Sequence, residues 1–248
     1  MAFPDLLKPK KLFLLKRVGK DNDGGYLIDF NSINNSKTLI SFGINDDWSF
    51  EESFSRLNSN CKIFCYDKNL SLYFLFKIFL KKVIFFYKHK FIDIYFSFLK
   101  IFQFIFFFKK NTLSRAKISY NFLTDLINNN SFENPIFLKI DIEEWEYRIL
   151  TDIIKVSNRL SGLVIEFHSV DFHLDKISDF IKKINLELTH LHANNGGIPK
   201  VDLNNNPTVI ELTFAKDPIV VSNEFVTPHY LDQKNIKELD DILIDFKS

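Results

Sequence analysis

The clearest indication of architecture is the stretch PIFLKIDIEEWEYRILTDIIKVSNRLSGLVIEF, residues 135–167. PIFLKI (135–140) and GLVIEF (162–167) are short apolar runs of the kind that form buried strands, and the residues between them have a helical pattern. A strand, a helix and a second strand in this order form a unit whose two strands lie parallel. The stretch therefore predicts an α/β fold.

The alternation of strands and helices extends in both directions from this unit. Further strands are expected at TLISF (38–42), at KIFCY (62–66) and at the start of ISYNFLTDLINNN (118–130). Helices are expected at SFEESFSRLN (49–58), with Ser49 as a cap, in the rest of 118–130 and at DKISDFIKKIN (175–185). LELTHLH (186–192) and TVIELTF (208–214) have no helix between them and predict an antiparallel pair. We therefore expect a Rossmann-like, doubly wound and mostly parallel seven-stranded sheet with one reversed strand.

The composition is that of a globular protein with one unusual segment. Of 248 residues, 46% are hydrophobic and 25% charged, and 32 basic residues nearly balance 31 acidic ones, so nucleic acid is not an expected partner. Residues 70–110, however, hold eight lysines against one acid, Asp93, and 13 of the 29 phenylalanines. This segment predicts a helical insertion after the second strand.

Three interpretations of this insertion differ in what covers its phenylalanines. The first is a pair of helices whose aromatic faces complete the core, with the lysines in solvent. The second is a pair of basic helices lying in a membrane interface. A spanning helix is not expected, because the longest stretch without lysine or aspartate is IFQFIFFF (101–108), shorter than the ~20 residues that a span needs.

The cysteines and the N-terminus both indicate the cytosol. Cys61 and Cys65 lie four apart in a predicted strand, on one face but too far apart to bridge, so we expect reduced thiols. The first 17 residues have only short apolar pieces, unlike the continuous core of a signal peptide. We therefore expect a cytoplasmic protein, peripheral at the inner face of the membrane if the insertion binds lipid.

In sheets of this kind, ligands bind beyond the carboxyl ends of the strands. Gly43 follows the first strand and permits a tight turn, but a G-x-G-x-x-G fingerprint is absent. Asp46 and Asp47 in the same loop would repel a pyrophosphate, which favours a neutral or cationic ligand. Asp67 ends the second strand 24 residues after Gly43, near the spacing at which an acid grips a ribose diol, although a solvated turn is the alternative.

The later strands end in further candidates. Asp141 and Glu143 follow 135–140, as functional acids or as favourable charges at a helix N-terminus. Glu166 and His168 point to one face, and His168 and His192 are candidates for proton abstraction. Asp141, Glu166, His168 and His192 could instead converge on a divalent metal, but no tight ligand spacing demands it, so no metal is predicted.

Several ordered pieces together resemble the class I S-adenosylmethionine-dependent methyltransferases of the FkbM-like group. The pieces are RVGKDNDGGYLI (17–28), LISFGINDDWSFEESF (39–54), FCYDKN (64–69), FLKIDIEEWEYRIL (137–150), VIEFH (164–168), HLHANN (190–195) and VIELTF (209–214). The resemblance runs from about residue 15 to the C-terminus, interrupted by 70–110. Two positions depart from the pattern: Glu144 stands where the family usually has glycine, and the first loop is poor in glycine.

The resemblance implies a role for each strand end. Gly43, Ile44 and Asn45 would contact the methionine part of S-adenosylmethionine, Asp67 its ribose, and Asp141 would lie beside the sulfonium. From their positions at the strand ends, and apart from the resemblance, Glu143, Glu166, Asn194 and Asn195 are expected to bind the acceptor, with His168 and His192 as catalytic residues beside Asp141. Residues 1–37 would form a segment near the cofactor site, and 38–248 the methyltransferase domain.

The expected reaction is O-methylation of a sugar or sugar-linked group in glycan biosynthesis. An NAD- or nucleotide-sugar-dependent oxidoreductase and a non-catalytic membrane-associated binding protein are the alternatives. The sequence does not determine the oligomeric state.

Overall fold

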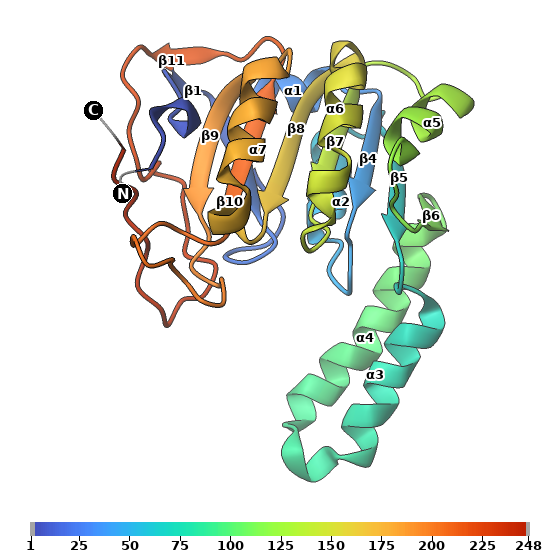
Figure 1. Ribbon diagram of the computed structural model, residues 1–248. Coiled ribbons are helices and arrows are strands. Elements are labelled where there is room, and N and C mark those ends of the chain that lie inside the picture. Colours follow the sequence, from blue (N-terminus) through green and yellow to red (C-terminus); the bar gives the residue numbers. More distant parts are fainter. Residues whose placement is uncertain (1–2, 247–248) are drawn as a thin grey trace.

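The computed structural model describes residues 3–246. Its centre is a seven-stranded sheet in the order β6-β5-β4-β7-β8-β10-β9, in which β10 runs antiparallel to both neighbours (Figure 1). The strands are β4 (Thr38–Phe42), β5 (Lys62–Asp67), β6 (Thr112–Arg115), β7 (Ile136–Ile140), β8 (Leu160–Phe167), β9 (Glu187–Ala193) and β10 (Ile210–Ala215). The predicted Rossmann-like, mostly parallel sheet with a reversed strand is confirmed.

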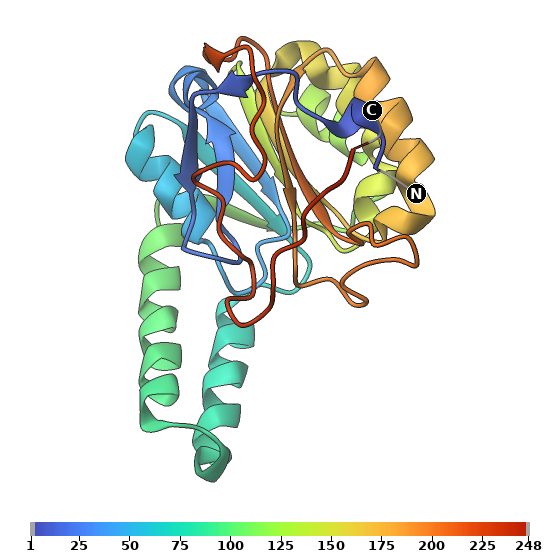
Figure 2. The same ribbon diagram turned by 90° about the vertical axis from the view of Figure 1, so that its left-hand side faces the viewer.

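Helices cover both faces of this sheet. On one face lie α5 (Phe122–Asn129), α6 (Leu150–Val156) and α7 (Val170–Lys183), and on the other α1 (Phe30–Asn35) and α2 (Ser49–Leu57) (Figures 1 and 2). Two apolar clusters correspond to these two layers. One packs Leu138, Ile165 and Phe180 with their neighbours, and the other packs Ile28, Phe54 and Phe137.

The two ends of the chain wrap around the sheet. After a short helical turn, Asp5–Leu7, strand β1 (Leu12–Phe13) pairs with β11 (Val220–Ser222) near the C-terminus. Strands β2 (Leu15–Val18) and β3 (Tyr26–Asp29) form an antiparallel hairpin. This hairpin is tied to the sheet by the Thr213 hydroxyl, which donates to the Leu27 carbonyl at 2.7 Å.

Three local predictions need correction. The strand expected at the start of 118–130 lies earlier, at β6, where Thr112–Arg115 pair with the end of β5. Ser49 is the first helical residue of α2 rather than its cap. The helix expected after β7 is divided into a 3-10 helix, Trp145–Arg148, and α6, with a further 3-10 turn at Ser157–Arg159.

The Phe/Lys-rich segment forms an arm of two helices, α3 (Leu72–Ile84) and α4 (Phe91–Phe108), joined through a turn that includes a 3-10 helix, Phe86–Lys88. The arm projects from the carboxyl-end side of the sheet (Figures 1 and 2). Helix α4 is long and apolar enough to cross a membrane, but little of it is buried. The interpretation in which these aromatic faces complete the core is therefore wrong for most of the arm.

Gly43 brings two strand-end loops into unusually close backbone contact. It has φ +76°, a conformation that favours glycine, and its N–H donates to the Tyr66 carbonyl at 3.2 Å. An added Cβ would meet the Asp141 carbonyl oxygen at 1.5 Å. The loops after β4 and β7 can therefore approach this closely only if the residue at position 43 has no side chain.

We expect Gly43→Ala to destabilise the protein severely. The left-handed conformation alone costs ~1–3 kcal/mol for a residue with a side chain, and the clash with Asp141 adds to that cost. Urea unfolding measures the loss. The matched control is Gly196→Ala, because Gly196 lacks a positive φ and its added Cβ would meet nothing closer than the Asn194 Oδ1 at 3.1 Å. Equal losses in the two variants would contradict the close crossing.

Candidate functional site

Two adjoining cavities open at the carboxyl ends of the strands. We call the first, of about 430 Å³, the β5-side cavity; its polar lining includes Asn45, Asp67, Asp141 and Glu143. The second, of about 580 Å³, is the β8-side cavity, and it is lined by residues that include Glu143, Glu166, His168 and Asn194. Glu143 lines both, so the site has two compartments that meet beside the end of β7.

Asp67 uses its whole carboxylate to hold backbone at the β5-side cavity. Its Oδ2 accepts from the N–H groups of Ile44 and Asn45 at 3.0 and 2.9 Å, and its Oδ1 accepts from Asn69 and Leu70 at 2.7 Å each. The residue thus fastens the Gly43 loop to the end of β5. The ribose contact stays a prediction, and the structure adds a positioning role beside it.

The acids of the Gly43 loop do not face the cavity as the sequence suggested. Asp46 Oδ2 pairs with Lys100 Nζ at 2.7 Å, and Asp47 Oδ2 pairs with Lys20 Nζ at 2.6 Å. Neither aspartate lines the β5-side cavity. The negative charge of the site therefore comes from other residues, chiefly Asp67, Asp141 and Glu143.

Lys139 is a buried cation beneath the site. It lies on central strand β7, only 5% exposed, and its Nζ donates to the Gly43 carbonyl at 2.7 Å and lies 3.4 Å from Asp141 Oδ2. Burial opposes its charge, but the nearby charges of Asp141, Glu51 and Glu166 outweigh burial and raise the pKa of Lys139. It therefore stays protonated and neutralises part of the acidic cluster. The sequence analysis did not single out Lys139, although a lysine within the apolar run of β7 is unusual and could have indicated a buried charged site.

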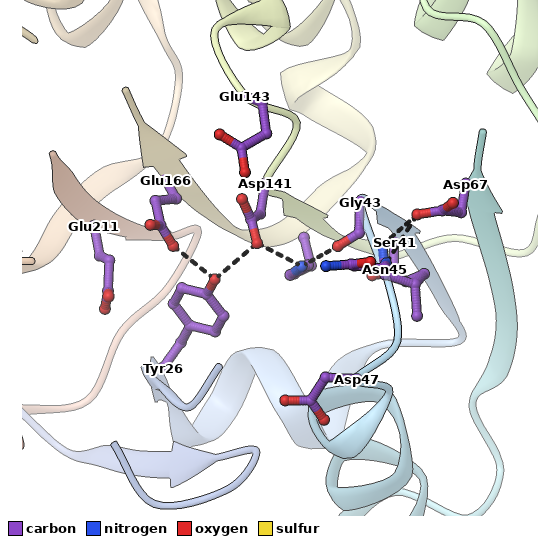
Figure 3. A network of polar contacts seen from close by, with 12 residues as sticks. Tyr26, Ser41, Gly43, Asn45, Asp47, Asp67, Asp141, Glu143, Glu166 and Glu211 are labelled. Atoms are coloured by element: carbon purple, nitrogen blue, oxygen red, sulfur yellow. Dashed lines mark hydrogen bonds and ion pairs between the residues drawn. The ribbon is translucent and has the colours of Figure 1, made fainter. Parts of the chain in front are cut away.

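Tyr26 links the acids at the ends of β7 and β8. Its hydroxyl donates to Glu166 Oε2 at 2.8 Å and lies 3.4 Å from Asp141 Oδ2 (Figure 3). Burial first, and then the charges of Asp141 and Glu166, raise the pKa of Tyr26 well above its usual range, so the phenol remains a donor. Sequence reasoning did not single out this residue, which the β2–β3 hairpin carries to the site.

His168 is held by one buried carboxylate and faces three others. Its Nδ1 lies 3.2 Å from Glu146 Oε1, which also accepts the His168 backbone N–H at 2.8 Å. Its Nε2 lies 3.9 Å from Asp141, 3.6 Å from Glu143 and 3.8 Å from Glu166. Burial lowers the pKa of His168, but Glu146, Glu166 and Asp141 together raise it to about 9. The imidazole is therefore mostly charged at neutral pH, and the fraction that can accept a proton grows as the pH rises toward 9.

Strained backbone lies where the two cavities meet. Glu143 and Glu144 have φ of 55° and 69°, and Ser169 has φ 51°. The Ser169 hydroxyl donates to the Glu144 carboxylate, which joins the loops after β7 and β8. Glu144 thus adopts the left-handed conformation that glycine takes freely. Such conformations cluster at functional sites.

Three further predicted residues have different outcomes. Asn194 belongs to the site, since its Nδ2 donates to Glu166 Oε1 at 2.9 Å. Asn195 does not line either cavity; its buried side chain binds the backbone of Ile236 through both amide atoms, so its predicted substrate contact is replaced by a structural one. His192 lies apart, with Nδ1 3.4 Å from Glu211 Oε2, and it lines a separate cavity. The geometry gives no support to its predicted catalytic role.

Asp141, Glu166 and His168 could hold a metal ion. Each offers one ligand atom, and these atoms all lie within 4.8 Å of one another. Two carboxylates and an imidazole suit a divalent cation. Of the four residues considered from the sequence, the structure brings three together and leaves out His192.

The geometry as a whole suits a reaction between two bound molecules. A ligand in the β5-side cavity and another in the β8-side cavity would meet beside Asp141 and Glu143, next to a proton-carrying cluster formed by Tyr26, Glu166 and His168. Such a pair of compartments fits group transfer, in which positioning two reactants supplies much of the rate.

No protein-family model and no curated protein sequence matches the chain. Similar solved structures include a precorrin-6y C5,15-methyltransferase from Geobacter metallireducens, with 14% identity, a TM-score of 0.40 and coverage of 75% of this chain and 84% of that one. The methyltransferase domain of METTL16 has 7% identity and a TM-score of 0.42, over 75% and 61% of the two chains. The fibrillarin pre-rRNA processing protein of Methanococcus jannaschii has 8% identity and a TM-score of 0.40, over 74% and 68%. At such values, these similarities do not bear on what the chain does.

We expect Lys139→Met to destabilise the protein by ~3–5 kcal/mol, because removing one partner of a buried ion pair leaves an uncompensated buried charge. Urea unfolding at pH 7 measures the loss. The matched control is Lys62→Met, which breaks an exposed pair with Glu133 and should change the free energy of unfolding far less. A Lys139 variant as stable as the control would show that the acidic cluster does not need this cation.

Proposed function

We propose that this chain is an S-adenosylmethionine-dependent methyltransferase that binds its cofactor in the β5-side cavity and its acceptor in the β8-side cavity. The observation that carries the proposal is the meeting of these two cavities at the end of β7, with Asp141 in the wall of one and Glu143 in the wall of both. The motifs shared with the FkbM-like group support the same assignment.

The lining of the β5-side cavity fits a nucleoside that carries a positive charge. Asp67 and Asn69 offer polar groups on one side, and Ile118, Ile142 and Trp145 offer apolar surface for a flat base. Asp141 supplies the negative charge that a sulfonium favours. We assign the methionine part to the Gly43 loop and the sulfonium to the neighbourhood of Asp141. We assign the ribose to Asp67, whose carboxylate would exchange a backbone bond for a ribose hydroxyl. A dinucleotide fits less well, because the loop lacks the glycine pattern that cradles a pyrophosphate.

The β8-side cavity fits a polyhydroxylated acceptor. Carboxylates and amides at its wall, including those of Glu143, Glu166, Asp171 and Asn194, can bond to several hydroxyl groups at once. This chemistry favours a sugar or a sugar-linked group over an apolar acceptor. We therefore propose O-methylation of a glycan.

The residues around the reacting oxygen orient it and take its proton. S-adenosylmethionine, if held by the Gly43 loop and Asp67, would supply the methyl group, whose bond to sulfur would break as its bond to the acceptor oxygen forms. Glu143 and Asn194 are placed to hold the acceptor, and neutral His168 takes the hydroxyl proton at Nε2. Glu146 accepts from Nδ1 and so fixes the ring with Nε2 toward the cavity. Tyr26 and Lys139 hold Glu166 and Asp141 in place.

Ligand binding tests the cofactor assignment. We expect S-adenosylhomocysteine, and neither NAD nor a nucleotide sugar, to raise the thermal midpoint, since a ligand at 100 times its dissociation constant adds ~2.7 kcal/mol. Asp67→Ala should weaken the affinity for S-adenosylhomocysteine in calorimetry and also lower stability, because four backbone N–H groups lose their acceptor.

The matched control for this test is Asp202→Ala. Asp202 also accepts backbone N–H groups, from Asn204 and Asn206, but it lines neither cavity, so its loss should leave the affinity unchanged. A midpoint that rises with NAD alone would support the oxidoreductase alternative. No shift with any of these ligands would favour a non-catalytic binding protein.

The pH dependence of turnover tests the role of His168. Because the base must be unprotonated and its pKa is about 9, we expect turnover with a glycan acceptor to rise with pH up to about 9. His168→Gln should lose ~100-fold or more in turnover at pH 9 while keeping cofactor affinity. Glu146→Gln keeps a hydrogen-bond acceptor but removes the charge that raises the His168 pKa, so its profile should move to lower pH.

If the pH profile of turnover is identical in wild type and His168→Gln, His168 is not the base.

The turnover assay is also run with and without a chelator. Turnover that is lost on chelation and restored by Mg²⁺ would instead assign Asp141, Glu166 and His168 to a divalent ion.

A further inference from the structure

We propose that the arm formed by α3 and α4 binds the surface of an anionic lipid bilayer. The arm leaves the carboxyl-end side of the sheet, and beyond its base its two helices pack mainly on each other, for example through the rings of Phe79 and Phe98 at 5.7 Å (Figures 1 and 2). The base is fastened by Phe104 and Phe108 against Trp48 and by the pair between Lys100 and Asp46.

Most of the apolar surface of the arm faces outward. Of its helical residues, Leu75, Ser97 and Phe104 are buried, whereas Phe91 is 84%, Tyr73 74% and Phe106 70% exposed. The other large exposed apolar side chains are Leu72, Phe76, Leu80, Val83, Ile84, Phe85, Phe86, Tyr87, Ile92, Tyr95, Phe96, Phe98, Phe102 and Ile105. So many large exposed apolar side chains on two neighbouring helices indicate an interaction site rather than a surface that faces water.

The positive charge of the arm indicates which kind of partner it binds. Residues 70–110 carry eight lysines and a single acid, Asp93, and Lys100 is the lysine paired with Asp46 at the base. Lys81, Lys88 and Lys90 are exposed around the turn between the helices. Basic side chains among aromatic ones match anionic head groups above an apolar layer. A second copy of the same arm would bring lysines against lysines, so the charge does not favour a dimer through this surface.

The dimensions favour an arm lying in the interface over one that crosses the bilayer. At 1.5 Å per residue, α4 with 18 residues is ~27 Å long and approaches the ~30 Å of a hydrocarbon layer, whereas α3 with 13 residues is ~20 Å long and is too short to return across it. A crossing would also carry the charges of the turn, Lys81, Lys82, Lys88 and Lys90, through the apolar layer, which is costly. In the interface, the lysines stay with head groups while the aromatic rings enter the lipid.

The arm begins directly after the β5-side cavity. Asp67, Lys68 and Asn69 line that cavity, and α3 starts at Leu72. An arm held on a membrane therefore places the edge with both cavities toward the lipid surface. This consequence, which rests on the proposed function, favours a glycan carried on a lipid as the acceptor. The membrane contact itself does not depend on that function.

Flotation of the full-length protein with liposomes tests the contact. We expect co-flotation at low salt with vesicles of phosphatidylcholine and phosphatidylglycerol, and none with phosphatidylcholine alone. The triple variant Lys81→Gln, Lys88→Gln, Lys90→Gln should lower the partition coefficient by ~100-fold, and raised salt should act in the same direction. Phe86→Ser, Phe91→Ser, Phe106→Ser should abolish flotation even at low salt, because it removes three exposed rings.

Two matched controls separate the arm from the rest of the surface. Lys182→Gln, Lys183→Gln, Lys216→Gln neutralises three exposed lysines outside the arm, and Tyr230→Ser, Leu243→Ser removes exposed apolar side chains there. Both should float like wild type. All variants should keep their thermal midpoint, since the altered side chains are exposed.

Three outcomes would overturn the proposal. The first is failure of the wild type to float at low salt, and the second is a loss of flotation in the control variants equal to that in the arm variants. The third is a stable dimer, seen by sedimentation without lipid, that becomes monomeric in the arm variants. S-adenosylhomocysteine binding is measured on the same samples. If the protein floats but does not bind S-adenosylhomocysteine, the membrane contact stands and the proposed function is wrong. If it binds S-adenosylhomocysteine but does not float, only the membrane contact is wrong.

Discussion

The buried ammonium group of Lys139 makes the rest of the site physically feasible. Asp141, Glu51 and Glu166 are acids at or near the carboxyl end of one sheet, and three such charges in a low-dielectric region repel one another. A cation on central strand β7 offsets this repulsion and also binds the Gly43 carbonyl at the loop crossing. The electrostatics and the backbone geometry of the site thus depend on the same side chain.

The phenylalanines of the arm are mostly exposed, whereas those of the domain that carries it are mostly buried. Within the sheet layers, phenylalanines such as Phe54 and Phe137 are fully buried, and their removal from water stabilises the fold. In the arm, the same residue type remains in contact with solvent, because two helices can bury only the faces that they turn toward each other. The stability of the domain therefore does not explain the exposed rings of the arm, which the proposed contact with a lipid surface would cover.

Much of the fold followed from the sequence. Continuous apolar runs such as 135–140 and 162–167 are typical of buried strands, and their alternation with helical patterns predicted the parallel sheet. The absence of a helical pattern between 186–192 and 208–214 predicted the reversed strand. Weaker signals failed locally. The edge strand β6 was placed too late, because TLSR has little hydrophobicity and pairs with β5 through its backbone. The sequence also indicated which side chains gather at one edge of the sheet, since parallel strands bring their carboxyl ends together; they are Asp67, Asp141, Glu143, Glu166 and His168.

What the sequence alone determined was therefore the set of residues at that edge, because a two-residue side-chain period and strand order are local properties. Only the tertiary structure decided which of them meet. It brought Tyr26 from a distant hairpin to Glu166, placed Glu146 behind His168, turned Asn195 to the C-terminal segment and left His192 beside Glu211. These outcomes depend on contacts between residues far apart in the chain, whose free energies are set by packing and burial, and no spacing in the sequence encodes them.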